Sequence, residues 1–280
     1  MTGMENLWGN QLYQQRARLA FPILVRQALA TTPVTYEDLA QELGMPNPRN
    51  LNFVLGCVGR SLQKLEEQWK ERVPPLQSLV INKATRIPGE GIDWFIDDLK
   101  NYRRQSRKQR ESIIHAKLRE VYAYQHWNEV LETLDLQPLA PVFAPLLAEA
   151  SRRGGGEGEE HRRLKLFVAQ HPEILNLTGK RGLTEVEHRL PSGDVIDVFF
   201  MRGKEVIGVE VKPSTADEAD IVRGLYQCIK YKAVLQARQS VELKPQNART
   251  FLVLGGALPE ALVGLRNMLG ISVIENVQSF

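Results

Sequence analysis

The sequence contains few cysteines and no long hydrophobic run. Its 280 residues include two cysteines, Cys57 and Cys228, which lie far apart in the chain. Two cysteines can build neither a disulfide framework nor a zinc cluster, and such a low content is typical of a reducing compartment. No segment approaches eighteen consecutive apolar residues, so the sequence predicts no membrane-spanning helix. We therefore expect a cytoplasmic protein with no membrane partner.

The sequence also lacks a strong excess of either charge. It has 36 lysines and arginines against 33 aspartates and glutamates, which gives a formal net charge of +3. Because this excess is slight, basic surfaces must be sought segment by segment rather than in the chain as a whole. Hydrophobic residues make up 43% of the chain and charged residues 25%, as in ordinary globular proteins. The length is sufficient for two domains.

One segment of low complexity divides the chain. Between positions 154 and 158, four of the five residues are glycine. Glycine-rich segments are typical of flexible linkers, so we place the domain boundary here. The sequence therefore predicts a first domain at 1–97, a helical connector at 98–150, a linker at 151–158 and a second domain at 159–280.

Three helices are predicted at the start of the first domain. Apolar residues recur at helical spacing over 5–30 and again over 50–69. Between them, Thr35 is suited to cap a short helix and Gly44 to end it. This short helix has the pattern Thr-x-x-x-Leu-Ala-x-x-Leu-Gly, which resembles the helix-turn-helix of winged-helix domains. The resemblance implies that 76–96 supplies a strand and a glycine-rich wing, and that the third helix enters the major groove of DNA.

Basic residues of the first domain and of the connector are candidates for contacts with nucleic-acid phosphates. In the connector, five basic residues fall within eight positions, and such a run can neutralise several phosphates. The alternatives are a helical packing module that binds nothing and a solvated helix between domains. The candidates are Arg60, Lys64, Lys83 and Arg86 in the first domain, and Arg103, Arg104, Arg107, Lys108 and Arg110 in the connector.

The second domain shows the order helix, three strands, helix, strand, helix, strand. Tight turns separate the first three strands, so we expect them to pair antiparallel, whereas a helix separates the third strand from the fourth. This order predicts an α/β fold in which helices flank a mixed sheet. The predicted helices cover 159–171, 219–238 and 259–269, and the predicted strands cover 184–190, 194–201, 205–212, 250–256 and 271–277.

Three charged residues lie in the most apolar strands of this domain. Glu210 and Lys212 share one face of their strand because successive side chains alternate. Asp197 precedes Glu210 by 13 positions, across the predicted hairpin. Burying unpaired charge is costly, so these groups should neutralise one another or bind a cation at the end of the sheet. Two converging carboxylates suit Mg²⁺ or Mn²⁺, whereas the alternative is a salt bridge on a solvated edge strand.

This arrangement resembles the PD-(D/E)xK nuclease superfamily, which has the restriction-endonuclease-like fold. That pattern has an acid on the first helix, an aspartate on the second strand and Glu-x-Lys on the third. Asp197 and Glu210-Val211-Lys212 match the strand positions, although Asp194 competes with Asp197. Gln227 falls in a segment that is similar to the Gln-x-x-x-Tyr helix of some members. The candidates on the first helix are Glu160, which we favour, and the alternatives Glu157 and Glu159.

The resemblance implies a role for each of these residues. Asp197 and Glu210 would hold one or two Mg²⁺ ions, and Glu160 would reach the metal through water. Lys212 would position the attacking water, and Gln227 would steady Lys212 or a phosphate. The basic residues available to phosphates on the following helix are Arg223 and Lys230.

Two functions of different class follow. The resemblance implies a metal-dependent DNA endonuclease of bacterial restriction or phage-defence type, whose first domain selects the site and whose second domain cuts. The alternative is a catalytically inactive DNA-binding or interaction protein on the same fold. DNA is favoured over RNA as the partner, and a homodimer would supply two sites for cutting both strands.

Overall fold

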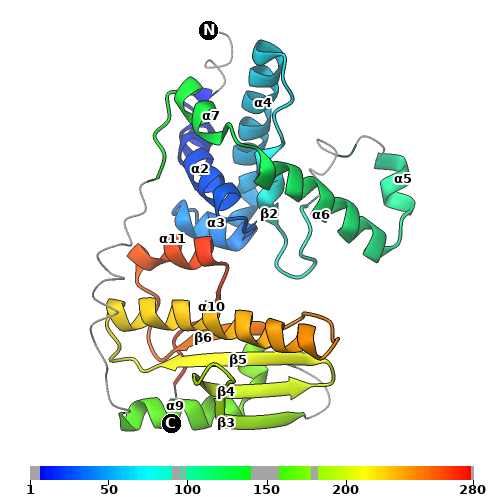
Figure 1. Cartoon of the computed structure of the whole chain (residues 1–280). Coiled ribbons are helices and arrows are strands. Elements are labelled where there is room, and N and C mark those ends of the chain that lie inside the picture. The colour runs from blue at the N-terminus through cyan, green and yellow to red at the C-terminus, as the bar shows by residue number, and fades with distance from the viewer. Residues whose placement is uncertain (1–6, 90–95, 97–98, 140–157, 178–181, 279–280) are drawn as a thin grey trace. The chain divides into compact units, whose positions relative to one another are not determined.

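The computed structural model divides the chain into two compact units, Met1–Ala140 and Pro141–Phe280 (Figure 1). Each unit has its own hydrophobic core. Most of the predicted linker and the middle of the predicted wing lie outside the described residues. Among the helices that the structure describes, none is long and apolar enough to cross a lipid bilayer. The structure describes all residues except 1–6, 90–95, 97–98, 140–157, 178–181 and 279–280.

The first unit is mainly helical, and its two longer N-terminal helices, α2 and α4, pack against each other. Strands β1 and β2 form a small parallel sheet beside them. The elements are α2 Leu12–Leu29, β1 Val34–Thr35, α3 Tyr36–Glu42, α4 Leu51–Trp69, β2 Val80–Ile81, α5 Leu99–Arg104, α6 Arg107–Ala123 and α7 Trp127–Thr133, with short 3₁₀ helices at Pro48–Asn50 and Leu76–Leu79.

Local chemistry explains where these elements begin. Helix α3 starts as predicted, because the hydroxyl of Thr35 accepts a hydrogen bond from the backbone N–H of Asp38 over 3.1 Å. The predicted strand at the start of 76–96 is wrong over its first half. There the N–H of Ser78 donates to the carbonyl of Pro75 over 2.9 Å and closes a 3₁₀ turn, so that only Val80–Ile81 pair as a strand.

The second unit is a five-stranded mixed sheet flanked by helices, which confirms the predicted α/β fold. The strand order is β3-β4-β5-β6-β7; the first two pairings are antiparallel and the last two are parallel. The elements are α9 Glu159–Gln170, β3 Leu183–Arg189, β4 Val195–Arg202, β5 Glu205–Lys212, α10 Glu218–Val241, β6 Arg249–Leu254, α11 Glu260–Leu269 and β7 Ser272–Ile274, with a 3₁₀ helix at Pro172–Leu175.

Helices cover both faces of this sheet (Figure 1). On one face, Leu164 and Val168 of α9 pack with Val198 and Val209. On the other face, Tyr231 of α10 packs among residues of β4. Because both faces are covered, β4 and β5 are apolar over most of their length, and their charged residues Asp197 and Glu210 are buried.

The antiparallel pairing of β4 with β5 stops before the ends of both strands. Val198 pairs with Val209, and within these two described strands the pairing does not continue from there to Asp197. On the other side of β4, Val186 of β3 pairs with Val198 and His188 pairs with Ile196. Glu187 and Asp197, which lie between these pairs, are not paired with each other in the sheet. The strands therefore separate at Asp197, and this point forms the candidate site.

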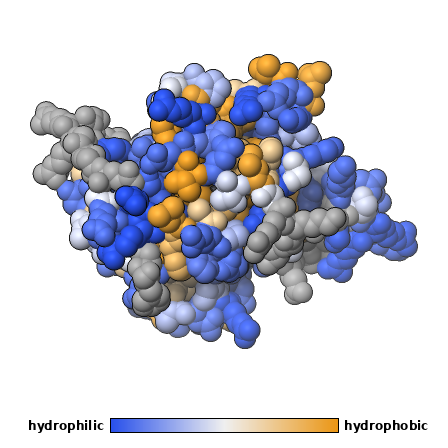
Figure 2. All heavy atoms as spheres, turned by 90° about the horizontal axis from the view of Figure 1, so that it is seen from below, coloured by the Kyte–Doolittle hydropathy of each residue, from blue (hydrophilic) through white to orange (hydrophobic). Residues whose placement is uncertain are grey.

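The surface of the molecule is mainly hydrophilic on the face drawn in Figure 2, where small apolar areas lie among polar side chains. Exposed apolar residues of the second unit include the cross-strand neighbours Leu183 and Met201, which are 44% and 39% exposed. A few exposed apolar side chains of this kind are ordinary on protein surfaces.

Candidate active site

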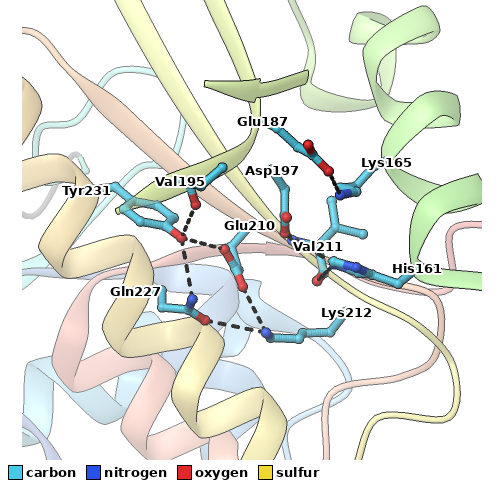
Figure 3. A network of polar contacts seen from close by, with 10 residues as sticks. All are labelled: His161, Lys165, Glu187, Val195, Asp197, Glu210, Val211, Lys212, Gln227 and Tyr231. Atoms are coloured by element: carbon cyan, nitrogen blue, oxygen red, sulfur yellow. Dashed lines mark hydrogen bonds and ion pairs between the residues drawn. The ribbon is translucent and has the colours of Figure 1, made fainter. Parts of the chain in front are cut away.

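The carboxylate of Glu210 and the ammonium of Lys212 lie on the face of β5 that α10 covers (Figure 3). Lys212 Nζ donates to Glu210 Oε1 over 2.8 Å and to Gln227 Oε1 over 3.3 Å. Glu210 is 3% exposed, so its charge is almost entirely removed from water. The predicted side-by-side placement of these two residues is present, and Gln227 joins them from α10.

A glycine on α10 makes room for the lysine. A Cβ atom at Gly224 would lie 3.0 Å from Lys212 Cε and 2.8 Å from a methyl group of Leu252. Real Cβ atoms almost never approach other atoms this closely, so any larger residue at 224 must displace a neighbour. The absence of a side chain at Gly224 thus permits α10 to lie close to β5 beside Lys212.

Tyr231 completes the polar cluster on this face. Its hydroxyl lies 2.9 Å from Glu210 Oε2 and 2.8 Å from the carbonyl oxygen of Val195, and it is within 3.4 Å of Gln227 Nε2. Burial and the nearby carboxylate of Glu210 raise the pKa of Tyr231, so the phenol keeps its proton and acts as a donor. Tyr231 and Lys212 together hold both oxygens of Glu210.

Asp197 lies where β4 and β5 separate, and its side chain replaces a backbone contact. The N–H of Val211 donates to Asp197 Oδ2 over 2.8 Å. Asp197 is 9% exposed. Without this carboxylate the N–H of Val211 would be a buried donor without its partner, which proteins rarely tolerate.

His161 reaches the same point from α9. Its Nε2 lies 2.9 Å from the carbonyl oxygen of Val211 and 3.3 Å from Asp197 Oδ2. A carbonyl oxygen can only accept, so Nε2 carries the hydrogen in this arrangement. The hydrogen bond with Asp197 is the main reason that the pKa of His161 is raised, against the opposing effect of burial.

The charges of the cluster act on one another. Burial, followed by the negative charge of Asp197, raises the pKa of Glu210 to about 7, while Lys212 opposes this shift. Two carboxylates that repel each other in a buried place would gain from a cation between them. Perturbed carboxyl groups of this kind are common at functional sites.

The donor atoms present suit a hard divalent cation. In the described part of the chain, both contacts of the Asp197 carboxylate use Oδ2, which leaves Oδ1 as an acceptor. Glu210 and the carbonyl of Val211 supply further oxygens beside it. Across the described residues, no group of three or more His, Cys, Asp and Glu side chains is arranged to hold a metal ion. The oxygens available are therefore those of two carboxylates and one backbone carbonyl. Mg²⁺ suits these oxygens, because it commonly uses one or two carboxylates together with water and substrate oxygens.

Two of the acidic residues that competed for the site, Glu160 and Asp194, contact other partners. Glu160 accepts from the N–H and the hydroxyl of Ser214 over 2.8 and 2.6 Å, and these bonds lower its pKa. Neighbouring helical residues point about 100° apart, so α9 directs His161 to Asp197 and Glu160 to the loop after β5. Asp194 forms an ion pair with Lys230 over 2.7 Å. Glu159 is exposed, and Glu157 lies outside the described residues.

His161 is the site residue that sequence reasoning missed. The signal was its spacing, because it precedes Leu164 and Lys165 by one helical turn, and both of these are buried. A residue one turn before two buried residues belongs to the same face of the helix. Its partner could not be identified from the sequence, since Val211 lies 50 positions away.

The basic residues proposed for phosphate contacts are spread over both units. On α10, Arg223 contacts Asp220 over 2.9 Å and Lys230 contacts Asp194, so both have acidic partners. In the first unit most of the candidates are at the surface: Arg60, Lys83, Arg86, Arg103, Arg104 and Lys108 are exposed, Lys64 and Arg110 are partly buried, and the side chain of Arg107 lies outside the description.

Comparisons with known proteins place few constraints on the chain. No family model matches it. No curated protein matches it either. Among solved structures, the chain is similar to a repair endonuclease from Pyrococcus abyssi, with 16% sequence identity and a TM-score of 0.32. That similarity covers 45% of this chain and 50% of the other, so the chain spans about half the length of the structure that it matches.

Proposed function

We propose that the protein is a metal-dependent nuclease that hydrolyses phosphodiester bonds of DNA at Asp197, Glu210 and Lys212. The observation that supports this most is the meeting of two buried carboxylates and a lysine where two strands separate, with His161 on the opposite side. A purely structural salt bridge needs one acid and one base, whereas this cluster holds a second buried acid. Mg²⁺ or Mn²⁺ is the cofactor that the oxygen donors suit.

The residues of the cluster would have two kinds of role, binding the cation and positioning the groups around it. Asp197, Glu210 and the carbonyl of Val211 would hold the cation, which when bound supplies Lewis-acid polarisation of the phosphate. Lys212 would orient the attacking water and stabilise negative charge that develops on the phosphate. Tyr231 and Gln227 keep Glu210 and Lys212 in position. His161 fixes the orientation of Asp197, a role that we assigned to no residue from the sequence.

The first unit would bind the DNA. Thr35 caps α3, eight residues that include the 3₁₀ helix Pro48–Asn50 separate α3 from α4, and Arg60 is exposed on α4. If α3 and α4 act as a helix-turn-helix, as the resemblance of the sequence implies, α4 would enter the major groove of DNA. The exposed basic residues of α5 and α6 would add affinity that does not depend on sequence. A role in restriction or phage defence remains part of this proposal, as does a dimer with two cutting sites.

One observation favours the second candidate, a DNA-binding protein without catalysis. The described residues contain no group of three or more metal-binding side chains, and Lys212 is already paired with Glu210. An inactive protein would use the same fold to bind DNA without cutting it.

Incubation of the protein with supercoiled plasmid distinguishes the two candidates. The wild type should nick the plasmid with Mg²⁺ or Mn²⁺ and not with EDTA. Lys212→Met should lose this activity, while Lys244→Met should retain it, because Lys244 pairs with Glu242 on the exposed surface. If the wild type binds DNA without metal-dependent nicking, the inactive DNA-binding protein is favoured. If Lys212→Met nicks the plasmid as fast as the wild type, Lys212 has no role in the reaction.

A further inference from the structure

A second ion pair lies beside the candidate site, between residues that the mechanism does not use. Lys165 Nζ donates to Glu187 Oε1 over 2.8 Å (Figure 3). Lys165 belongs to α9, one turn after His161, and Glu187 belongs to β3. The pair therefore joins the helix that carries His161 to the strand that passes Asp197.

The cation of this pair is deeply buried. The side chain of Lys165 is 4% exposed, whereas that of Glu187 is 55% exposed. A buried ammonium is costly unless a partner compensates it, and the carboxylate of Glu187 reaches Lys165 from the surface. This combination differs from the exposed ion pairs of the second unit, in which both partners contact water.

The backbone at Glu187 is unusual for a strand. Its φ angle is +58°, in the left-handed region that residues other than glycine seldom adopt. Val186 and His188 pair with β4 on either side, while Glu187 itself is passed over opposite Asp197. Such a conformation costs on the order of 1–3 kcal/mol and persists only where the surroundings hold it in place.

The pair also interacts electrostatically with residues of the site. The hydrogen bond with Lys165 is the main cause that lowers the pKa of Glu187, and the charges of Asp197 and His161 act on it too. Lys165 in turn opposes the protonation of His161. Charges on α9 and β4 therefore act on the carboxylate of Glu187 in β3.

We propose that Lys165 and Glu187 are positioning residues for the site, holding α9 and β3 so that His161 meets Asp197 and Val211. This inference rests on the proposed function, because positioning has meaning only if Asp197 binds a cation. Lys165 and Glu187 would act on the reaction only indirectly. Their effect is exerted through the places of His161 and Asp197.

The experiment compares two neutral variants with a matched control. Glu187→Gln and Lys165→Met remove one charge each at nearly constant volume, and the double variant removes both. Glu205→Gln is the control, because Glu205 pairs with Arg249 over 2.9 Å in the same sheet, away from the site. Binding of Mn²⁺ to each protein is measured by calorimetry, and nicking of plasmid gives kcat and KM.

We expect Glu187→Gln to weaken Mn²⁺ binding at least fivefold and to lower kcat at least tenfold, with KM within twofold of the wild type. The double variant should lose less than the product of the two single losses, because the residues act as one unit. Glu205→Gln should stay within twofold in both measurements. Mn²⁺ affinity and kcat within twofold of wild type in Glu187→Gln and in the double variant would overturn the inference.

The two proposals fail separately. If the wild type binds Mn²⁺ and does not cut DNA, the nuclease function is wrong, and the affinities of the variants still decide the positioning role. A loss of Mn²⁺ affinity that only follows a loss of folded protein would also overturn the inference. Glu187→Gly tests this, because glycine relieves the left-handed backbone while it deletes the carboxylate. It should fold well and bind Mn²⁺ as weakly as Glu187→Gln.

Discussion

The N–H of Val211 donates to Asp197 Oδ2 over 2.8 Å at the point where β4 and β5 separate. One carboxylate thus serves the backbone of the sheet and also lies at the candidate site. The consequence is that substitutions at Asp197 can affect stability and activity independently, depending on whether the new side chain can still accept a hydrogen bond.

The first prediction separates these two effects. Asp197→Asn should abolish nicking and leave the free energy of unfolding within about 1 kcal/mol of wild type, because the amide oxygen can still accept from Val211. Asp197→Ala should lose activity and also about 1–3 kcal/mol of stability, the cost of a buried unsatisfied N–H. Urea unfolding and plasmid nicking measure the two quantities. Asp194→Asn is the control, and a loss of activity in this variant would indicate that Asp194 belongs to the site.

The second prediction concerns the two neighbours on α9. His161→Asn should reduce nicking strongly, because the imidazole that holds Asp197 and the Val211 carbonyl is removed. Glu160→Gln should reduce it little, since Glu160 contacts Ser214 and its side chain is near the surface. Rates of nicking at saturating Mg²⁺ measure both. The opposite order of effects would make Glu160 the residue that completes the site, as we expected from the sequence.

The third prediction follows from the pKa of Glu210. The folded protein raises this pKa from its ordinary value of 4.5 to about 7, so between these values the folded state binds more protons than the unfolded state. The stability that this group contributes is therefore present below pH 4.5 and is lost as pH rises through 7. Glu210→Gln should be more stable than wild type at pH 8, by roughly 1–3 kcal/mol, and equally stable at pH 4. Urea unfolding without metal at the two pH values measures this difference, and an equal gain at both values would contradict it.

The fourth prediction tests the close packing of α10. Alanine normally favours a helix over glycine by about 1 kcal/mol, yet Gly224→Ala should destabilise the protein by roughly 1–3 kcal/mol, because its Cβ would meet Leu252 and Lys212. Displacement of Lys212 should also slow nicking. Gly56→Ala on α4 is the matched control, since its Cβ would meet only the flexible end of Arg60. Thermal unfolding of the two variants should move in opposite directions, and stabilisation of both would contradict the packing argument.

The fifth prediction concerns the basic residues of α5 and α6. Replacing Arg103, Arg104 and Lys108 with glutamine should weaken DNA binding to a similar degree for unrelated sequences. The slope of log affinity against log salt should become shallower by about 0.9 for each phosphate contact that is lost. Fluorescence anisotropy at several salt concentrations measures this slope. An unchanged slope would assign these residues to a solvated helix.

The hairpin that carries the site could be predicted because its pattern is local. Alternation along β5 determines that Glu210 and Lys212 share a face, and the apolar character of both strands indicates that they are buried. The angle between Glu160 and His161 on α9 is equally a matter of local geometry. Which of them faces the site depends on how the helix packs on β4 and β5, and this is decided by residues far away in the sequence.

Other features could not be predicted for physical reasons of the same kind. The left-handed backbone of Glu187 has no marker in its sequence, because glycine or asparagine would be the ordinary choice at such an angle. The first half of the predicted strand that begins at Leu76 forms a 3₁₀ turn, since Pro75 accepts the hydrogen bond that closes it. In the first case contacts with α9 and β4, and in the second a local hydrogen bond, prevail over the general preference of the residue types.

The separation of β4 from β5 has a consequence for the order of folding. Asp197 and Val211 are 14 positions apart, whereas the pairing of β5 with β6 must wait until the long segment containing α10 has crossed the sheet. Contacts of short sequence separation close with a smaller loss of chain entropy. We therefore expect the β4–β5 hairpin to become protected from hydrogen exchange before β6 does, so that the acidic half of the site forms on a nascent sheet that the later strands then stabilise.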